Sequence, residues 1–171
     1  MNTMAVLIID MQDFFLKHID QTIREEMIAN QGKVIERCVE SQIPIILVQY
    51  KDRGDITDAL QAKLKDVPNV TLVIKEHNSG FRDTTLGDVL IEKKIKKLGL
   101  MGINATGCVQ DTAMGALSRG LTIMTGKGVI ASSSKNDRYL DVSRVWFSKN
   151  GDFFETPEEF VAALNKSGYT S

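Results

Sequence analysis

The sequence is poor in the residues that build disulfide frameworks, membrane spans and charged binding surfaces. Its 171 residues include only two cysteines, with no C-x-x-C pair, which excludes a disulfide framework and indicates a reducing compartment. The net charge of −1 gives no general attraction for nucleic acid or anionic membranes. The apolar run from Met4 to Ile9 is short and follows no basic leader, so it predicts neither a signal peptide nor a membrane span. We expect a cytoplasmic protein.

What is present is the composition of an ordinary globular protein. Hydrophobic residues make up 43% of the chain and charged residues 25%, which argues against disorder. The length is close to the ~150 residues that are typical of one domain. There is no internal repeat and no stretch long enough for a linker. We therefore expect a single domain over residues 1–171.

Short, continuously apolar runs alternate with helical patterns along the chain. Such runs are typical of strands that are buried on both faces of a parallel sheet, joined by right-handed crossovers. Strands are expected over 5–9, 45–48, 70–74, 98–103 and 121–125, with a sixth, edge strand over 142–147. Helices are expected over 20–40, which could break at Gly32, and over 58–65, 86–98, 108–120 and 156–165.

Two opposite charges stand at equivalent ends of predicted strands. Asp10 follows the first strand and Lys75 follows the third. Open α/β sheets hold their ligand sites at the carboxyl ends of strands, so the pair suggests a shared site. Each residue also has a structural alternative: Asp10 could cap the following turn, and Lys75 could simply face solvent.

Cys108 lies where the predicted strand over 98–103 turns into the next helix. Unpaired backbone N–H groups and the positive end of the helix dipole gather at such a point, and both favour thiolate over thiol. Cys108 is therefore a candidate nucleophile, although a free cysteine can equally be a small buried hydrophobe. Cys38, on the apolar face of the helix over 20–40, is expected in the core.

Taken together, three segments resemble the isochorismatase-like cysteine hydrolase superfamily. Residues 10–15 (DMQDFF) are similar to the family's D-M-Q-x-x-F opening, and Lys75 with Ser79-Gly80-Phe81 is similar to its K-x-x-x-S-A-F. Residues 102–113 (GINATGCVQDTA) are similar to its G-x-x-x-x-x-C-V-x-x-T-A. Order, spacing and strand context agree over nearly the whole chain.

The resemblance implies a fold and a triad. The fold is α/β, in three α/β/α layers, Rossmann-like, with a mostly parallel six-stranded sheet and helices on both faces. The implied triad is Cys108, Asp10 and Lys75: the thiol attacks a carbonyl carbon to form a thioester, Asp10 carries the proton to the leaving amine, and Lys75 stabilises both groups. By analogy with the family, a cis bond between Ile103 and Asn104 aims the backbone N–H groups of Asn104 and Cys108 at the oxyanion.

The substrate pocket is expected beside this triad. Phe15 and Phe81 are predicted as its apolar walls, with a core role as the alternative for either ring. We expect Gln12 to orient Asp10 through a hydrogen bond, and the Asn104 side chain to face the substrate. Specificity in this family lies in the loops that correspond to 50–66 and 130–139.

The sequence departs from the family pattern at the metal site. The nicotinamidase branch carries an Asp and closely spaced histidines after the second strand, whereas here residues 52–54 (DRG) are followed by no histidine. His18 and His77 are far apart, so we predict no metal and no cofactor. His77, two residues after Lys75, could contact a ligand or be an ordinary surface histidine.

The presence of Cys108 helps to distinguish between the branches of this family. The isochorismatase branch commonly lacks it, so Cys108 favours hydrolysis of an amide or ureide C–N bond in a small molecule. The alternative is a catalytically silent family member that acts as a binding or oligomerisation module. A dinucleotide-binding oxidoreductase is disfavoured because no G-x-G-x-x-G follows a predicted strand. Relatives are often dimers or larger, so we also expect a homo-oligomer.

Overall fold

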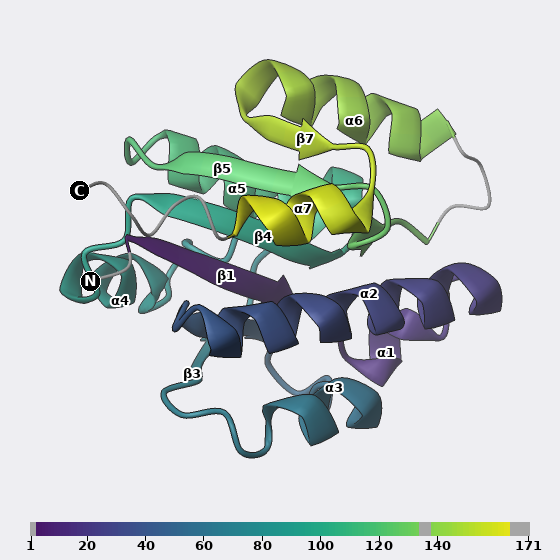
Figure 1. The fold of residues 1–171 in the computed structure, drawn as a ribbon, viewed down its shortest axis with the longest axis horizontal. Coiled ribbons are helices and arrows are strands. Elements are labelled where there is room, and N and C mark those ends of the chain that lie inside the picture. Colours follow the sequence, from purple (N-terminus) through teal and green to yellow (C-terminus); the bar gives the residue numbers. More distant parts are fainter. Residues whose placement is uncertain (1–2, 134–137, 165–171) are drawn as a thin grey trace.

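The computed structural model describes residues 3–133 and 138–164 (Figure 1). The strands are β1 (Met4–Ile9), β2 (Ile45–Tyr50), β3 (Thr71–Lys75), β4 (Lys97–Ile103), β5 (Thr122–Gly126), β6 (Ile130–Ala131) and β7 (Asp152–Phe154). The helices are α1 (Asp13–Leu16), α2 (Gln21–Glu40), α3 (Asp58–Leu64), α4 (Leu86–Glu92), the π-helical turn η1 (Ala105–Val109), α5 (Gln110–Leu117), α6 (Arg138–Asn150) and α7 (Pro157–Ala163).

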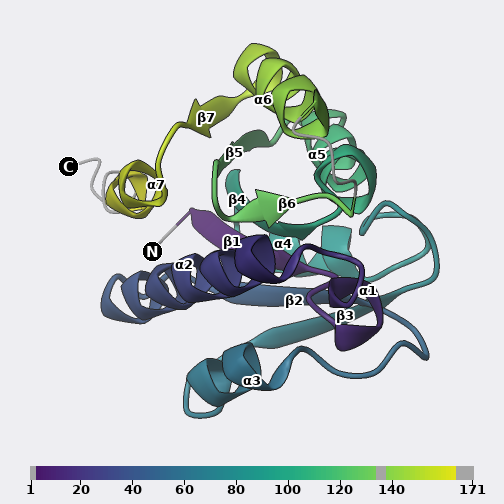
Figure 2. The ribbon, with the colours of Figure 1, turned by 90° about the vertical axis from the view of Figure 1, so that its right-hand side faces the viewer.

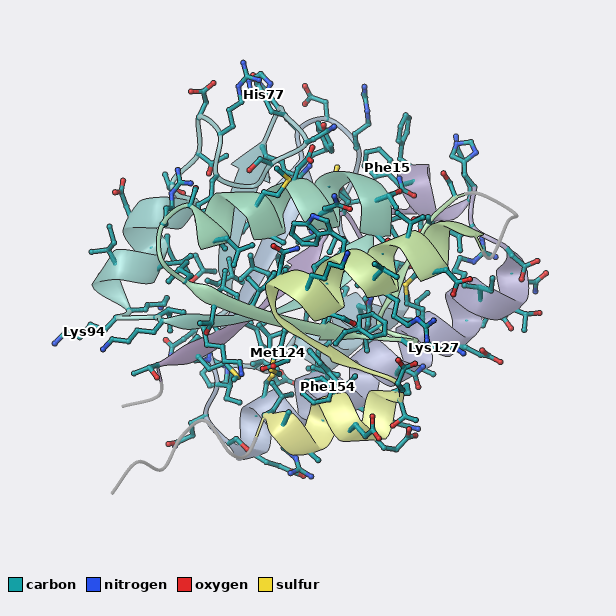
Figure 3. All side chains as sticks on the ribbon, turned by 90° about the horizontal axis from the view of Figure 1, so that it is seen from above. Phe15, His77, Lys94, Met124, Lys127 and Phe154 are labelled. Atoms are coloured by element: carbon teal, nitrogen blue, oxygen red, sulfur yellow. The ribbon has the colours of Figure 1, made fainter. Side chains whose placement is uncertain are left out.

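The strands form one parallel sheet in the order β3-β2-β1-β4-β5-β7, and the two-residue β6 also pairs with β4. Figure 2 shows α2, α3 and α7 on one side of the sheet and α5 and α6 on the other. In Figure 3, Lys94, before β4, and Lys127, after β5, lie at opposite ends of the molecule, as the common strand direction requires. The expected α/β, Rossmann-like fold with a parallel sheet is confirmed.

The first strand is the centre of the core. Every residue of β1 is at most 1% exposed, and fully burying one large aliphatic side chain contributes about 1.5–3 kcal/mol. On one side Ile9 is in register with Val48 of β2, and on the other with Gly102 of β4. The chain builds the sheet outward from β1 in both directions, so the strand order reverses between β1 and β4, and open α/β sheets hold their ligand sites at the carboxyl ends of such strands.

The predicted edge strand over 142–147 is wrong, because these residues belong to helix α6. Ser143 and Phe147 are buried and stand four residues apart, which is a helical repeat, while Val142 and Val145 are about half exposed. The β-branched valines suggested a strand, but they lie on the solvent side of the helix. The edge strand next to β5 is β7, a few residues later, and β3 forms the opposite edge of the sheet.

The predicted helix over 86–98 is too long. Helix α4 ends at Glu92, and Lys94 has a φ of 56°, a left-handed conformation that turns the chain away from the helix axis. Lys97 then begins β4, in register with Met4. The chain therefore turns at Lys94 and enters the sheet where the prediction continued the helix.

Helix α2 continues without a break through Gly32, where the sequence suggested one. Asp20 caps its start, since its carboxylate accepts a hydrogen bond from the backbone N–H of Ile23 at 3.2 Å. Among the described residues, no helix combines the length and the apolar character needed to cross a bilayer.

Candidate active site

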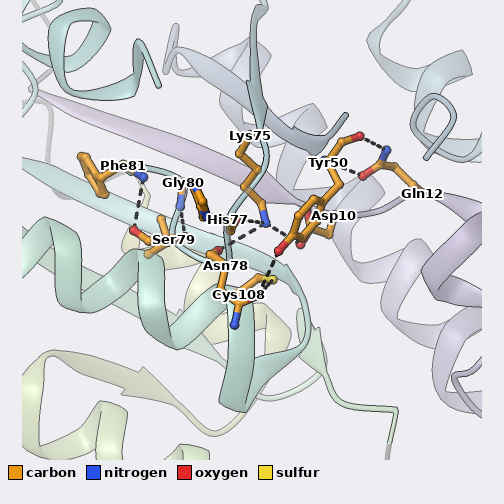
Figure 4. Close-up of polar contacts among 11 residues, drawn as sticks. Asp10, Gln12, Tyr50, Lys75, His77, Asn78, Ser79, Gly80, Phe81 and Cys108 are labelled. Atoms are coloured by element: carbon orange, nitrogen blue, oxygen red, sulfur yellow. Dashed lines mark hydrogen bonds and ion pairs between the residues drawn. The ribbon is translucent and has the colours of Figure 1, made fainter. Parts of the chain in front are cut away.

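Three strand ends bring their polar side chains together at the carboxyl edge of the sheet. The ammonium Nζ of Lys75 lies 3.1 Å from Oδ2 of Asp10, and both side chains are buried, at 0% and 2% exposure. Cys108, in the turn after β4, is the third member of the group and is 8% exposed (Figure 4). The structure therefore brings the three predicted triad residues together.

The ammonium group of Lys75 contacts several neighbouring groups. Its ammonium donates to the backbone oxygens of His77 at 3.0 Å and Asn78 at 3.2 Å, in addition to its contact with Asp10. It also lies 3.6 Å from the ring centroid of Tyr50, the last residue of β2. An ammonium has three protons to donate, so these partners account for the cation and fix its position.

The backbone geometry of β1 and β4 makes this approach possible. Asp10 has a φ of 54°, in the left-handed region that Asp tolerates better than most residues, and its N–H donates to the Val48 oxygen at 2.9 Å. Gly102 has a φ of 131°, and a Cβ there would stand 2.0 Å from the Ile9 oxygen. Only glycine fits, so Gly102 lets the two strand ends meet.

The turn that carries Cys108 begins with a cis peptide bond between Ile103 and Asn104, as the resemblance implied. The Asn104 oxygen accepts hydrogen bonds from the N–H groups of Gly107 at 3.0 Å and Val109 at 3.1 Å, which closes the turn. The Asn104 side chain is also engaged, since its Oδ1 accepts from the Ser133 N–H at 2.8 Å. It thus ties the chain after β6 to the turn.

Electrostatics at the site differ from the expectation for a helix N-terminus. Burial, and next the negative charge of Asp10, raise the pKa of the Cys108 thiol to about 12, while Lys75 opposes the shift. Burial also raises the pKa of the Asp10 carboxyl, again against the pull of Lys75. Burial and the neighbouring carboxylate therefore favour the thiol form of Cys108, whereas the helix dipole alone favours the thiolate.

The arrangement favours proton transfer inside the group. Losing the thiol proton to solvent would leave a net negative charge in a buried site, but passing it to Asp10 keeps the group neutral. The Asp10 carboxyl is within hydrogen-bonding reach of Cys108. Its Oδ2 contacts Lys75, while its Oδ1 has no nitrogen or oxygen partner in the described part of the chain. Asp10 can therefore act as the base for this thiol.

Two residues that sequence reasoning missed complete the site. The Tyr50 hydroxyl donates to Oδ1 of Asn78 at 2.9 Å, and Sγ of Cys108 lies 3.8 Å from the same oxygen (Figure 4). Burial raises the pKa of Tyr50, and the charges of Cys108 and Asp10 add to the effect. Both positions carried a signal, because Tyr50 ends a strand beside β1 and Asn78 closely follows Lys75.

Gln12 has a different role from the one predicted. Its Nε2 donates to the backbone oxygens of Tyr50 at 3.0 Å and Gly54 at 2.6 Å, and its Oε1 accepts from the Tyr50 N–H at 2.9 Å. The side chain is fully buried. Gln12 therefore joins the chain after β1 to the chain after β2, and in the described part of the chain its side chain bonds to Tyr50 and Gly54 and not to Asp10.

The two phenylalanines predicted as pocket walls lie in different places. Phe15 is half-buried and packs against Tyr50, with ring centroids 5.6 Å apart. Phe81 is buried under the guanidinium of Arg119, 4.3 Å from its ring centroid, and lines a separate cavity of about 470 Å³. Phe81 is therefore not a wall of the pocket beside the triad, which corrects the prediction.

An open pocket of about 510 Å³ adjoins the triad. Tyr50 and Asn78, which contact Lys75 and Cys108, belong to its lining, and so does His77, whose Nε2 lies 3.3 Å from Oδ2 of Asp83. The full lining is Tyr50, Glu76, His77, Asn78, Ser79, Arg82, Asp111 and Met114. Within the described ranges, no three His, Cys, Asp or Glu side chains gather in a way that could hold a metal ion.

The chain is thus a parallel α/β sheet with a buried cysteine, aspartate and lysine at the carboxyl ends of its strands. The isochorismatase domain matches residues 4–145, so this chain belongs to the isochorismatase-like hydrolase family. The match confirms the resemblance of the three motifs.

Relatives and solved structures agree with this assignment. Isochorismatase family protein 2A of Dictyostelium discoideum is 28% identical over 171 residues, covering 96% of this chain and 84% of that protein. The nicotinamidase of Staphylococcus aureus superposes with a TM-score of 0.78 at 21% identity, covering 91% of this chain and 100% of that one. The MAR1 ribonuclease of Caenorhabditis elegans superposes with a TM-score of 0.80 at 25% identity, covering 96% and 83%.

Proposed function

We propose that the protein is a metal-independent cysteine hydrolase that cleaves the C–N bond of an amide or ureide in a small molecule. The observation that carries the proposal is the buried Lys75–Asp10 ion pair beside the Cys108 thiol, next to an open pocket. The name of the nicotinamidase with the same fold describes an amide hydrolase, which supports the reaction class.

The proposed reaction follows from the charges of the site. Sγ of Cys108 bonds to the carbonyl carbon while its proton passes to Asp10, and the carbonyl π electrons move to oxygen. Backbone N–H groups of Asn104 and Cys108 stabilise that oxyanion. When it collapses, the C–N bond breaks and the amine leaves with the proton from Asp10. Water, deprotonated by Asp10, then attacks the thioester and releases the acid and the thiol.

A nuclease is the competing activity, because one solved structure of this fold is named a ribonuclease. The pocket argues for a small molecule instead: its lining includes two carboxylates, from Glu76 and Asp111, and the net charge of the chain is −1. Binding of a polyanion needs a surplus of positive charge, which these residues do not provide.

The test is a panel of small amides and ureides, assayed for release of ammonia or amine. We expect turnover by the wild type and by Cys38→Ala, and a loss of at least about 10³-fold in kcat/KM for Cys108→Ala, because removing a nucleophile abolishes covalent catalysis. Mass spectrometry of quenched reactions should show the acyl group on Cys108.

Hydrolysis that survives in Cys108→Ala would contradict the proposal. Cleavage of single-stranded RNA by the wild type, abolished by the same substitution, would favour the nuclease instead. Full biological activity in Cys108→Ala without turnover in any assay would favour the silent binding module.

A further inference from the structure

The pocket beside the triad contains one carboxylate that no cation balances. Asp111 lines the pocket in the first turn of α5 and is half-buried. Among the described residues it has no hydrogen-bond or ion-pair partner. It follows Cys108 by three residues, and residues three apart on a helix are neighbours on its surface, with Cβ atoms about 5–6 Å apart.

The other ionisable side chains of this pocket contact groups that can carry the opposite charge. Glu76 pairs with Lys51 at 2.8 Å, and His77 and Arg82 lie 3.3 and 4.0 Å from the Asp83 carboxylate. Behind the pocket, Lys75 balances Asp10. The unbalanced charge that the lining presents to a ligand is therefore the negative charge of Asp111.

We infer that Asp111 determines specificity by binding a cationic group of the substrate, such as an ammonium or a guanidinium. This inference rests on the proposed function and names its substrate class: small amides or ureides with a positive charge near the scissile carbonyl. Because Asp111 follows Cys108 by three residues across the junction of η1 and α5, we place the charge about two to four bonds from that carbonyl. A charge-assisted hydrogen bond to the carboxylate holds the cation, and Tyr50 and the half-exposed Met114 flank the intervening carbons.

Three matched probes test the charge preference. They are 3-aminopropanamide, which is cationic, its neutral isostere butanamide, and the anionic succinamate. We expect the wild type to prefer the cationic amide to the neutral one by about 10- to 100-fold in kcat/KM, the range of a charge-assisted hydrogen bond. Asp111→Asn should abolish the preference, mainly through KM, and Asp111→Lys should reverse it in favour of succinamate.

The matched control is Asp58→Asn, which makes the same chemical change in the first turn of α3, outside the pocket. An aspartate in a first turn also stabilises its helix through the dipole, and that structural role would lower every rate without changing the ratio between probes. The inference is overturned if Asp111→Asn keeps the cationic preference, or if the wild type prefers butanamide or succinamate.

A binding experiment separates failure of the proposed function from failure of the proposed role of Asp111. Binding of the same probes to Cys108→Ala, followed by calorimetry, needs no catalysis. If the cationic amide binds in an Asp111-dependent way while the wild type hydrolyses none of the panel, the hydrolase proposal fails and Asp111 remains a cation site. If hydrolysis occurs with no charge preference, the hydrolase proposal holds and the role of Asp111 is rejected.

Discussion

Burial is the largest cause of a raised thiol pKa at both cysteines of this chain, but their neighbours differ. Burial alone raises the pKa of Cys38 to about 12, because this thiol lies within the apolar core under α2. Burial also raises the pKa of Cys108 to about 12, but there the Asp10 carboxylate adds to the rise and the Lys75 ammonium opposes it. A thiol pKa by itself therefore does not identify the nucleophile.

What distinguishes Cys108 is a neighbour that can take its proton. A thiol in an apolar core has no acceptor, so ionisation creates a buried charge with nothing to balance it. Beside Asp10 and Lys75, the proton moves a short distance and the total charge stays the same. From this difference we infer that the reactivity of Cys108 depends on the balance of charge among Cys108, Asp10 and Lys75. Three substitutions test this contrast, in order of decreasing effect.

Lys75→Met should remove the charge balance and destabilise the fold. It leaves Asp10 buried without a cation, and breaking a buried pair from one side costs about 3–5 kcal/mol in the free energy of unfolding. The unpaired Asp10 then has a pKa further above its unfolded value, so the folded state takes up a proton more readily and the loss shrinks as pH falls. Urea unfolding at pH 8 and pH 5 measures both effects.

The control is Lys51→Met, which breaks the exposed Lys51–Glu76 pair at the rim of the pocket. Exposed pairs contribute little, so this variant should unfold nearly like the wild type at both pH values. Equal losses of unfolding free energy in the two lysine variants would show that the buried pair stabilises the fold no more than the exposed pair does.

Asp10→Asn should make Cys108 more reactive and the enzyme inactive. The substitution removes a negative charge that raises the thiol pKa and leaves Lys75 unopposed, so thiolate becomes more abundant at pH 8. We expect alkylation of Cys108 by iodoacetamide to accelerate by about 10-fold or more, the effect of one pKa unit. Hydrolysis should be lost because no group carries the proton to the leaving amine.

Cys38 serves as the internal comparison in the same experiment, since both alkylated peptides can be counted by mass spectrometry. Its rate should not respond to Asp10→Asn. In the wild type, the Cys108 rate should keep rising above pH 8.5 without a plateau. Slower alkylation of Cys108 in Asp10→Asn would refute the assignment of Asp10 as a cause of the raised pKa.

Cys38→Ala should have the smallest effect, and on stability only. It removes one buried sulfur from a packed core, which costs about 1 kcal/mol, as similar small truncations do. Thermal unfolding should register the loss, while the iodoacetamide rate of Cys108 stays at the wild-type value. A changed Cys108 rate would mean that the core under α2 is coupled to the site.

Much of the fold could be predicted because strands buried on both faces appear in the sequence as continuous apolar runs. Continuous runs such as 5–9 are buried on both faces, and no helix would hide all of their residues. Residues 142–147 misled the prediction because two exposed valines interrupted the helical pattern. The helix over 86–98 was predicted too long because a left-handed turn at one residue, Lys94, leaves little trace in composition.

The site was predictable to the extent that strand ends and motifs define it. Asp10, Lys75 and Cys108 could be found in this way. Tyr50 and Asn78 could not be ranked, since their importance depends on a hydrogen bond between residues 28 positions apart. The raised pKa of Cys108 could also not be predicted from the sequence. A position at a helix N-terminus would lower the thiol pKa, whereas burial and the nearby Asp10 carboxylate raise it.

The buried amide of Gln12 bears on how a ligand would bind. By joining Tyr50 and Gly54 to the chain that carries Asp10, it orders one wall of the pocket when the protein folds. The conformational entropy of that wall is therefore lost before any ligand arrives. Binding free energy does not have to be spent on ordering residues 50–54, so even a molecule of a few heavy atoms can reach the triad with most of its contact energy intact.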